Sequence, residues 1–431
     1  MSEKQAKADH RSKPTSENYQ AFIASGWAPR ETSLPERSQA AAAAATRREA
    51  VSAAFPGERL VIPAGGLKVR SNDCDYQFRP HSAFAHLTGL GTDREPDAVL
   101  VLEPRVEQSE GGQGGHEAIL FFRPLADRDS EEFFADSRVG EFWVGMRPTL
   151  ESMSAELGMT TRPLEGLKDA VGKDAGLVQL RIVRDADVEV TAMVEEVRST
   201  SGLVQSVESQ EEAVELDAVL GRTLSTLRMI KDDWEVDQMR LACAATATAF
   251  EAVAAELPAA AARDRGERWI EGIFGLHARH AGNGVGYDSI CAAGDHANTL
   301  HWIKNTGGVR SGDLVLIDAG VEVDSLFTAD VTRTLPVDGR FTEVQRRVYD
   351  AVYDAQCAGI AACRPGSTFK DVHAAAIRVI AERIFDWGLL PDGVDVEQSL
   401  AKEGQWHRRW MVHGTSHHLG IDVHDCQLAL R

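Results

Sequence analysis

The stretch VLIDAGVEVDSLFTADVTRT, residues 315–334, places Asp318 at the end of an apolar run and Asp330 within the next one. β-Branched and aromatic residues flank a turn-forming VDS segment at 323–325, and this pattern predicts an antiparallel hairpin. A hairpin centred on that segment would set the two aspartates directly opposite each other. Their Cβ atoms would then lie roughly 4.5 to 5.5 Å apart.

Two carboxylates this close among apolar neighbours require a compensating group. They would repel each other, and burying each ion would cost several kcal/mol. The residues alone leave three such groups open: a shared proton, an arginine, or one or more metal ions. A one-residue bulge would spoil the register, so it is also possible that one aspartate faces solvent as a turn or cap residue.

A cluster of histidines near the C-terminus favours the metal. The segment HGTSHHLGIDVH (413–424) holds four of the 14 histidines, namely His413, His417, His418 and His424. Imidazole and carboxylate ligands together suit Mn, Co, Zn or Fe, and a pair of such ions needs bridging carboxylates. A further imidazole, His301, lies in ANTLHWIKN (297–305), which we expect to be a β segment.

Composition narrows the class of protein. The 431 residues are 43% hydrophobic, which allows large cores and suggests two or three domains. A formal charge of −20 argues against binding to nucleic acid or to an anionic membrane. We find no membrane-spanning segment and no signal peptide in the sequence. The six cysteines are scattered and form no CxxC pair, which predicts a reduced, cytoplasmic protein without structural zinc.

Three zones follow one another along the chain. Residues 1–45 are polar and predict a flexible N-terminal tail. Residues 46–225 combine apolar strands, such as AVLVLEP (98–104) and EAILFFRP (117–124), with helical stretches, a pattern typical of an α/β domain. The glycine-rich segment between those two strands indicates a surface hairpin loop. Residues 226–431 form the third zone.

The third zone predicts an α+β domain. A helix should begin near residue 233 and stop at Pro258, and a second one should cover 264–280. Short β-rich segments follow, and then two more helices separated by the RPGS breaker at 364–367. We therefore expect helices flanking a mostly antiparallel sheet.

The order of these motifs resembles that of the pita-bread metallopeptidases, specifically the Xaa-Pro aminopeptidase (aminopeptidase P) family. The motifs are LVLIDAG with FTADVTRT, then HGTSHHLGIDVHD, preceded by ANTLHWIKN. The segments at 55–90 and 229–243 extend the similarity to about residues 46–426. The resemblance implies an N-terminal α/β domain of the creatinase/prolidase type and a C-terminal pita-bread domain.

The resemblance also implies site residues and a reaction. It assigns Asp318, Asp330 and His417 as ligands of two Mn²⁺ ions, and His301, His413 and His424 as catalytic and substrate-binding histidines. His418 would be a neighbour without a role. The substrate would be a peptide with proline at its second position, from which the first residue is released. Relatives often form dimers or tetramers, so a homodimer or homotetramer is possible.

One departure from the family pattern concerns the ligands. Two glutamate ligands are expected beyond the histidine-rich segment, but no glutamate follows Glu403. Asp422 and Asp425 lie nearby, but the matching positions in relatives are not ligands. We therefore expect a pita-bread domain lacking its last strands, as in a truncated or partial chain, with weak metal binding and little activity. The alternatives are a non-catalytic peptide- or protein-binding module, a prolidase-type dipeptidase and a creatinase.

Overall fold

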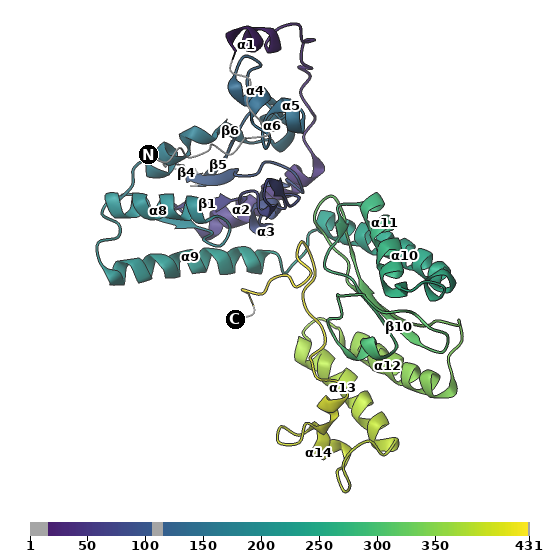
Figure 1. The fold of residues 1–431 in the computed structure, drawn as a ribbon. Helices are drawn as coiled ribbons and strands as arrows, with labels where there is room; N and C mark the ends of the chain where they lie inside the picture. Colours follow the sequence, from purple (N-terminus) through teal and green to yellow (C-terminus); the bar gives the residue numbers. More distant parts are fainter. Residues whose placement is uncertain (1–15, 106–114, 430–431) are drawn as a thin grey trace, which may run out of the picture. The chain divides into compact units, whose positions relative to one another are not determined.

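The chain folds into two compact units (Figure 1). The computed structural model describes residues 16–105 and 115–429. Among these, the N-terminal unit runs to Trp234 and takes in the chain again from Leu428, whereas the C-terminal unit spans Glu235–Gln427. Each unit has its own sheet.

The N-terminal unit is built on a five-stranded mixed sheet. Its strand order is β6-β5-β4-β1-β7. The strands are β1 (Arg59–Pro63), β4 (Val99–Pro104), β5 (His116–Phe122), β6 (Thr160–Pro163) and β7 (Leu180–Ile182). β4 pairs antiparallel with β1 and β5, while β7 and β6 pair parallel with β1 and β5, respectively. The two predicted strands are confirmed as β4 and β5, and the expected loop between them lies mostly outside the described residues.

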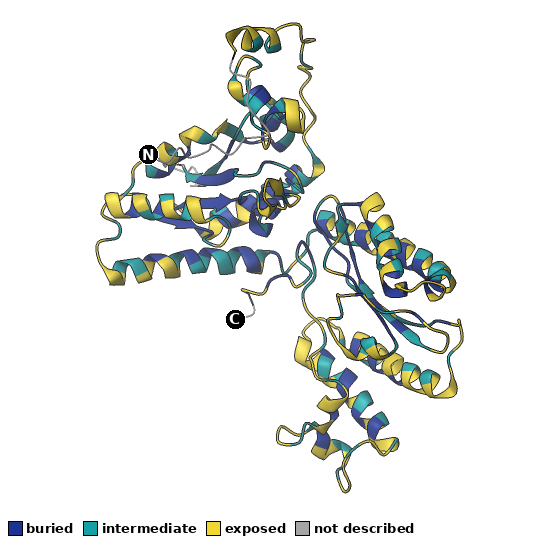
Figure 2. Cartoon of the chain, viewed as in Figure 1, coloured by how far each residue is buried: buried dark blue, intermediate teal, exposed yellow. Residues whose placement is uncertain are grey.

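Helices cover both faces of this sheet. Leu60 and Ile62 of β1 pack with α2 (Gln39–Ala54), α3 (Ser82–Thr88), α6 (Leu150–Leu157) and α9 (Val207–Leu227). Val61, on the opposite face, packs with α7 (Leu167–Gly172) and α8 (Val188–Thr200). A strand buried on both faces is a continuous apolar run rather than an alternating one, which explains the AVLVLEP pattern. The central strands β1 and β4 are accordingly mostly buried, as the dark blue of this layer in Figure 2 shows.

The remaining elements of this unit are short. They are α1 (Glu17–Ile23), β2 (Val69–Ser71), β3 (Cys74–Asp75), α4 (Glu131–Ala135), α5 (Glu141–Val144) and η1 (Leu164–Gly166). Part of the tail expected over residues 1–45, namely 1–15, lies outside the described residues. The described part contains α1 and the start of α2, which the Ser38 side chain caps by accepting from Ala41 N–H.

The C-terminal unit has a three-stranded antiparallel sheet, as predicted. Its strand order is β12-β10-β9, with β9 (Ile290–Ala293), β10 (Leu314–Ala319) and β12 (Val331–Pro336). A smaller pair joins β8 (Gly284–Val285) to β11 (Val321–Glu322). Figure 1 shows α10 (Asp233–Ala261) and α11 (Gly266–Ala281) on one side of β10 and α12 (Glu343–Ala362) on the other. α13 (Phe369–Asp386), α14 (Val396–Leu400), η2 (Gly294–Asn298) and η3 (Trp406–Arg409) complete the unit.

Two local predictions are wrong. The helix α10 does not stop at Pro258 but continues to Ala261. Near a helix end the proline removes only one backbone hydrogen bond, while its neighbours Leu257 and Ala260 remain buried. The segment around His301 is not a strand either, because it follows η2 as a turn.

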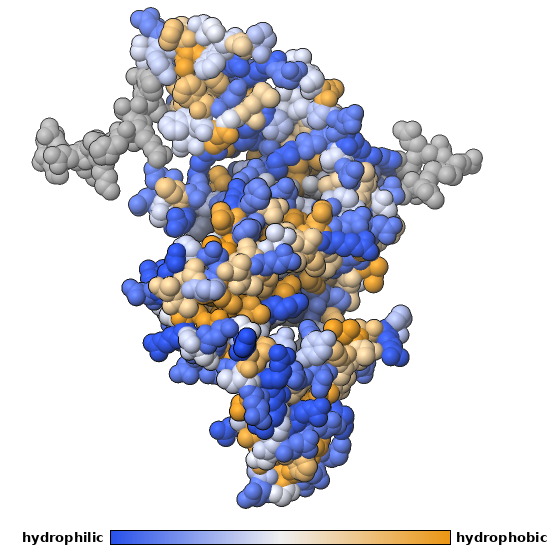
Figure 3. All heavy atoms as spheres, turned by 90° about the vertical axis from the view of Figure 1, so that its right-hand side faces the viewer, coloured by the Kyte–Doolittle hydropathy of each residue, from blue (hydrophilic) through white to orange (hydrophobic). Residues whose placement is uncertain are grey.

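The surface of the described residues mixes polar and apolar side chains. On the face drawn in Figure 3, hydrophobic residues lie among hydrophilic ones. Val344, Val348 and Val352, four residues apart on α12, are among the exposed apolar side chains. No helix in the described part of the chain is both long enough and apolar enough to span a bilayer.

Candidate active site in the C-terminal unit

The β10–β12 hairpin carries both aspartates on one face, but not directly opposite each other. Asp318 pairs with Thr332, and Asp330 lies just before β12, across from Gly320. The turn is centred on Ser325, one residue later than the sequence suggests, because the backbone pairs Glu322 with Thr328. The predicted direct opposition is therefore wrong by two residues. A shift of two keeps a side chain on the same face, so the aspartates remain diagonal neighbours.

A glycine permits the close approach of the two strands beside Asp330. A Cβ at position 320 would lie 1.6 Å from the carbonyl oxygen of Ala329, a distance that no side chain tolerates. Only glycine fits there, because it has no Cβ. The DAG motif is therefore explained by strand geometry as well as by the aspartate.

Tyr287 lies between the two carboxylates. Its hydroxyl is 2.6 Å from Asp318 Oδ1 and 2.8 Å from Asp330 Oδ1. Burial raises the pKa of Tyr287, and so do its hydrogen bonds to the aspartates and their charges. The phenol therefore stays protonated and can donate its one proton to either carboxylate. Sequence reasoning missed this residue, since a tyrosine in the segment before β9 carries no motif of its own.

His417 pairs with the second aspartate. Its Nε2 is 2.9 Å from Asp330 Oδ2, and its Nδ1 is 3.0 Å from the carbonyl oxygen of His418. Both partners are acceptors, so the tautomer of the ring decides which of them receives its N–H. In this arrangement His417 links the histidine-rich segment to the aspartate pair. In the described part of the chain, no lysine or arginine forms an ion pair with either aspartate.

The structure brings four of the six predicted site residues together. The ring of His424 lies 4.3 Å from that of His417, centroid to centroid, in an edge-to-face arrangement. Asp318, Asp330, His417 and His424 are thus linked through Tyr287 and through direct contacts.

The other two predicted residues do not contact this group. His301 lies exposed in the turn after η2. His413 is also exposed, with its Nδ1 2.8 Å from the carbonyl oxygen of Gly414. His418, expected to have no role, packs edge-on against Phe369 at 5.0 Å.

The donor atoms fit a metal ion only in part. Two carboxylates and an imidazole are a suitable donor set for one divalent cation. In the described residues, however, no three or more His, Cys, Asp or Glu side chains are arranged to hold an ion. Tyr287 contacts one oxygen of each aspartate, and His417 Nε2 contacts the second oxygen of Asp330. A pair of ions would need further bridging carboxylates.

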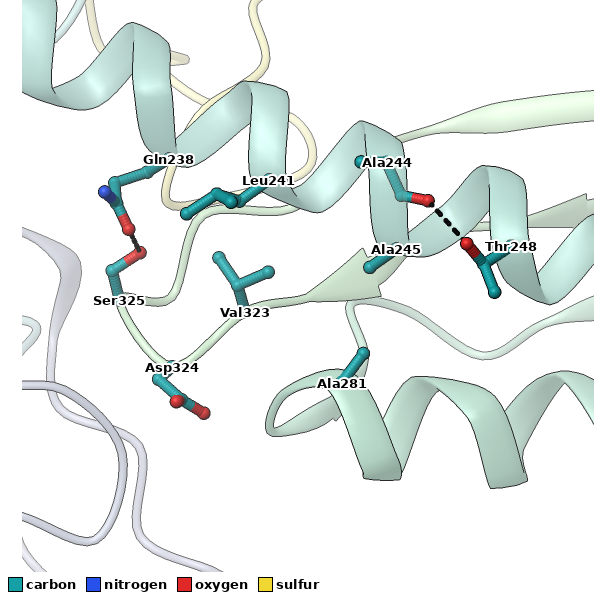
Figure 4. Close-up of a pocket in the computed structure, with 9 residues that line it drawn as sticks. All are labelled: Gln238, Leu241, Ala244, Ala245, Thr248, Ala281, Val323, Asp324 and Ser325. Carbon is teal, nitrogen blue, oxygen red and sulfur yellow. Dashed lines mark hydrogen bonds between the residues drawn. The ribbon is translucent and has the colours of Figure 1, made fainter.

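A groove of about 390 Å³ lies elsewhere in this unit, between α10 and the tip of the same hairpin. Figure 4 shows Leu241 and Val323 in its wall, with Ser325 Oγ donating to Gln238 Oε1 at 2.8 Å. None of the six predicted site residues lines it.

Comparison with known proteins covers both units. The sequence model for "Metallopeptidase family M24" matches residues 237–430, and that for "Aminopeptidase P, N-terminal domain" matches residues 44–178. Xaa-Pro aminopeptidase 1 of Streptomyces coelicolor is 46% identical over 405 residues, which cover 94% of this chain and 76% of the relative. The Escherichia coli Xaa-Pro aminopeptidase is 30% identical over 396 residues, covering 88% of this chain and 80% of the relative.

Solved structures agree with the sequence comparison. Aminopeptidase P from E. coli in its low-pH form aligns with a TM-score of 0.73 and 27% identity, covering 91% of this chain and 82% of that one. A zinc-substituted form of the E. coli enzyme in complex with product aligns with a TM-score of 0.72, 27% identity and the same coverage. The chain therefore belongs to metallopeptidase family M24 and, within it, to the aminopeptidase P enzymes.

Proposed function

We propose that this chain hydrolyses the peptide bond after the first residue of substrates whose second residue is proline. The observation that carries the proposal is the linked group of Asp318, Tyr287, Asp330 and His417 in a chain of this family. The peptide substrate and the Xaa-Pro specificity are taken from the relatives. Because the second residue is proline, the nitrogen of the scissile amide carries no hydrogen and cannot donate a hydrogen bond to the enzyme.

Asp318, Asp330 and His417 are the residues that would hold the divalent cation of the family, with Mn²⁺ as the expected ion. When bound, the cation supplies Lewis-acid activation for hydrolysis. The Tyr287 hydroxyl keeps the two carboxylates oriented toward each other on the hairpin face. His417 would contribute a ring nitrogen to the cation, and Asp318 and Asp330 would contribute carboxylate oxygens.

The exposed imidazoles are suited to bind the substrate and to stabilise charge on it during hydrolysis. His301, His413 and His424 are accessible, and histidine exchanges protons near neutral pH. We assign them to hydrogen bonding with the peptide and to stabilising the negative charge that develops on the carbonyl oxygen.

The direct test is cleavage of Ala-Pro-Ala with Mn²⁺ present, followed by mass spectrometry. Ala-Pro and creatine in parallel reactions separate prolidase and creatinase activity from the proposed one. Asp330→Ala should abolish cleavage. Asp324→Ala is the matched control, because Asp324 is exposed at the tip of the same hairpin. Cleavage by Asp330→Ala at the wild-type rate would refute the assignment of Asp330.

A second candidate is a peptide-binding module without catalysis. The observation in its favour is that the side chains of the group hydrogen-bond to one another, Tyr287 to both aspartates and His417 to Asp330. This candidate predicts that Ala-Pro-Ala binds in calorimetry with EDTA present and remains intact when Mn²⁺ is added.

Location and assembly are separate proposals. All six cysteines are free, which suits a reducing compartment, and we propose a cytoplasmic protein. A homodimer or homotetramer is carried over from relatives, and light scattering of the purified chain would measure it.

A further inference from the structure

A fully buried carboxylate on α11 organises the loop that carries His301. Glu267 is 0% exposed. Each of its carboxylate oxygens accepts two hydrogen bonds. Oε1 accepts from the backbone N–H of Ala293 at 2.9 Å and from His296 Nδ1 at 2.7 Å. Oε2 accepts from Trp302 Nε1 at 2.9 Å and from the backbone N–H of Gly307 at 2.6 Å. All four donors lie between the end of β9 and residue 307.

This arrangement keeps Glu267 ionised although it is buried. Burial raises the pKa of its carboxyl, but the hydrogen bonds from Ala293, Trp302, His296 and Gly307 together outweigh it and lower the pKa below the usual value. Among the described residues its ion-pair partner is His296, whose ring stacks on Trp302 at 3.9 Å. An ionised carboxylate that accepts four hydrogen bonds attaches the segment 293–307 strongly to α11.

The backbone is shaped to admit this carboxylate. A Cβ at position 307 would lie 2.6 Å from the His296 ring and 2.9 Å from the carboxyl carbon of Glu267. Only glycine allows so close an approach. In addition, the carbonyl oxygen of Gly307 accepts from the backbone N–H of Glu267 at 3.1 Å.

Asn305 attaches the same loop at a second point. Its side chain is fully buried, accepts from Cys291 N–H at 3.0 Å and donates to the carbonyl oxygen of Ser289 at 2.9 Å. The amide thus binds the edge of β9 as a neighbouring strand would. The loop is therefore fixed on both sides of His301, while the exposed imidazole of His301 makes no hydrogen bond with the described residues.

We propose that Glu267 is a positioning residue, which fixes the loop 294–307 and thereby the location of His301. The consequence for catalysis rests on the proposed function of His301, whereas the fixing of the loop does not.

Hydrogen exchange of the full chain tests the fixing of the loop without any activity measurement. Glu267→Gln keeps the shape but replaces an acceptor oxygen with an NH₂ group, so we expect exchange in peptides covering 293–307 to rise about tenfold or more. Gly307→Ala should have the same effect by pushing the carboxylate away. Glu271→Gln, one turn further along α11, is the matched control and should leave these peptides unchanged.

Two results would overturn the proposal. One is unchanged exchange over 293–307 in both Glu267→Gln and Gly307→Ala. The other is an equal rise in exchange throughout the C-terminal unit, which would make Glu267 a general stability residue.

Turnover of Ala-Pro-Ala then tests the link to His301. Glu267→Gln should lower kcat in the wild-type background and have no further effect in His301→Ala, because coupled residues are not additive. Additive losses would refute action through His301. If the chain shows no turnover at all, the proposed function fails while the exchange result still decides whether Glu267 fixes the loop.

Discussion

The loop 294–307 and the histidine-rich segment 413–424 both carry predicted site histidines, yet they are held in different ways. Glu267 and Asn305, both fully buried, fix the first. The contacts of the second include backbone donors: Thr328 N–H donates to the carbonyl oxygen of Gly420 at 3.0 Å, and Thr415 N–H to His373 Nδ1 at 3.3 Å. Its histidines are largely exposed.

This difference shows that two histidine-bearing segments of one unit can be positioned by contacts with different parts of the fold. The position of His301 is set by the buried carboxylate of Glu267, which binds the loop on both sides of His301 and not His301 itself. The position of His417 is set by Asp330, which is itself a predicted site residue. Changes at the aspartates should therefore disturb the second segment and spare the first.

The largest expected effect is that of Asp330→Asn. It weakens the contact with His417 and removes a charge from the proposed site, so we expect turnover to fall on the order of a thousandfold, or about 4 kcal/mol in the activation barrier. Hydrogen exchange should rise in peptides from 413–424 and stay unchanged in 294–307. Equal changes in both segments would contradict the separation of the two.

Asn305→Ala should have the next largest effect. It leaves the buried Cys291 N–H and the Ser289 carbonyl without their partner, which should lower the free energy of unfolding of the C-terminal unit by about 2 to 3 kcal/mol. Urea denaturation measures this. Asn298→Ala is the control, because that exposed side chain bonds only to the Asp295 carbonyl oxygen. A loss of similar size in the control would argue against Asn305 as an attachment point.

The third expected effect is a dependence of folding stability on pH that comes from Glu267. Because the pKa of Glu267 is lowered in the folded state, its ionisation stabilises the fold above the unfolded-state pKa. That contribution is lost as the pH falls below the ordinary glutamate pKa of 4.5 and through the lower folded-state pKa. The urea midpoint of the wild type should therefore drop more between pH 5 and pH 3 than that of Glu267→Gln. Parallel drops would show that Glu267 does not contribute to acid sensitivity.

The smallest effect belongs to His413→Ala. The side chain is exposed and its one hydrogen bond is to the adjacent residue, so stability should change by no more than about 0.5 kcal/mol. A proposed role in substrate binding would instead appear as a raised KM for Ala-Pro-Ala. A loss of stability comparable to that in Asn305→Ala would mean that the histidine-rich segment is anchored more firmly than its contacts indicate.

Local patterns predicted much of the fold. Apolar runs identified β4, β5 and β10, and the aspartates were correctly placed on one hairpin. The turn centre was missed by one residue, because VDS and DSL are equally acceptable turn sequences and only the packing of the two strands chooses between them. The prediction that α10 stops at Pro258 failed for a related reason. Burial of Leu257 and Ala260 outweighs the loss of one backbone hydrogen bond.

The sequence by itself determined the family and the order of most helices and strands, because these depend on short-range spacing. Only the tertiary structure decided which groups meet. Tyr287 lies far along the chain from Asp318 and Asp330, as Glu267 does from Gly307. Such contacts form between segments that share no local pattern, so they arise only when the helices and strands pack.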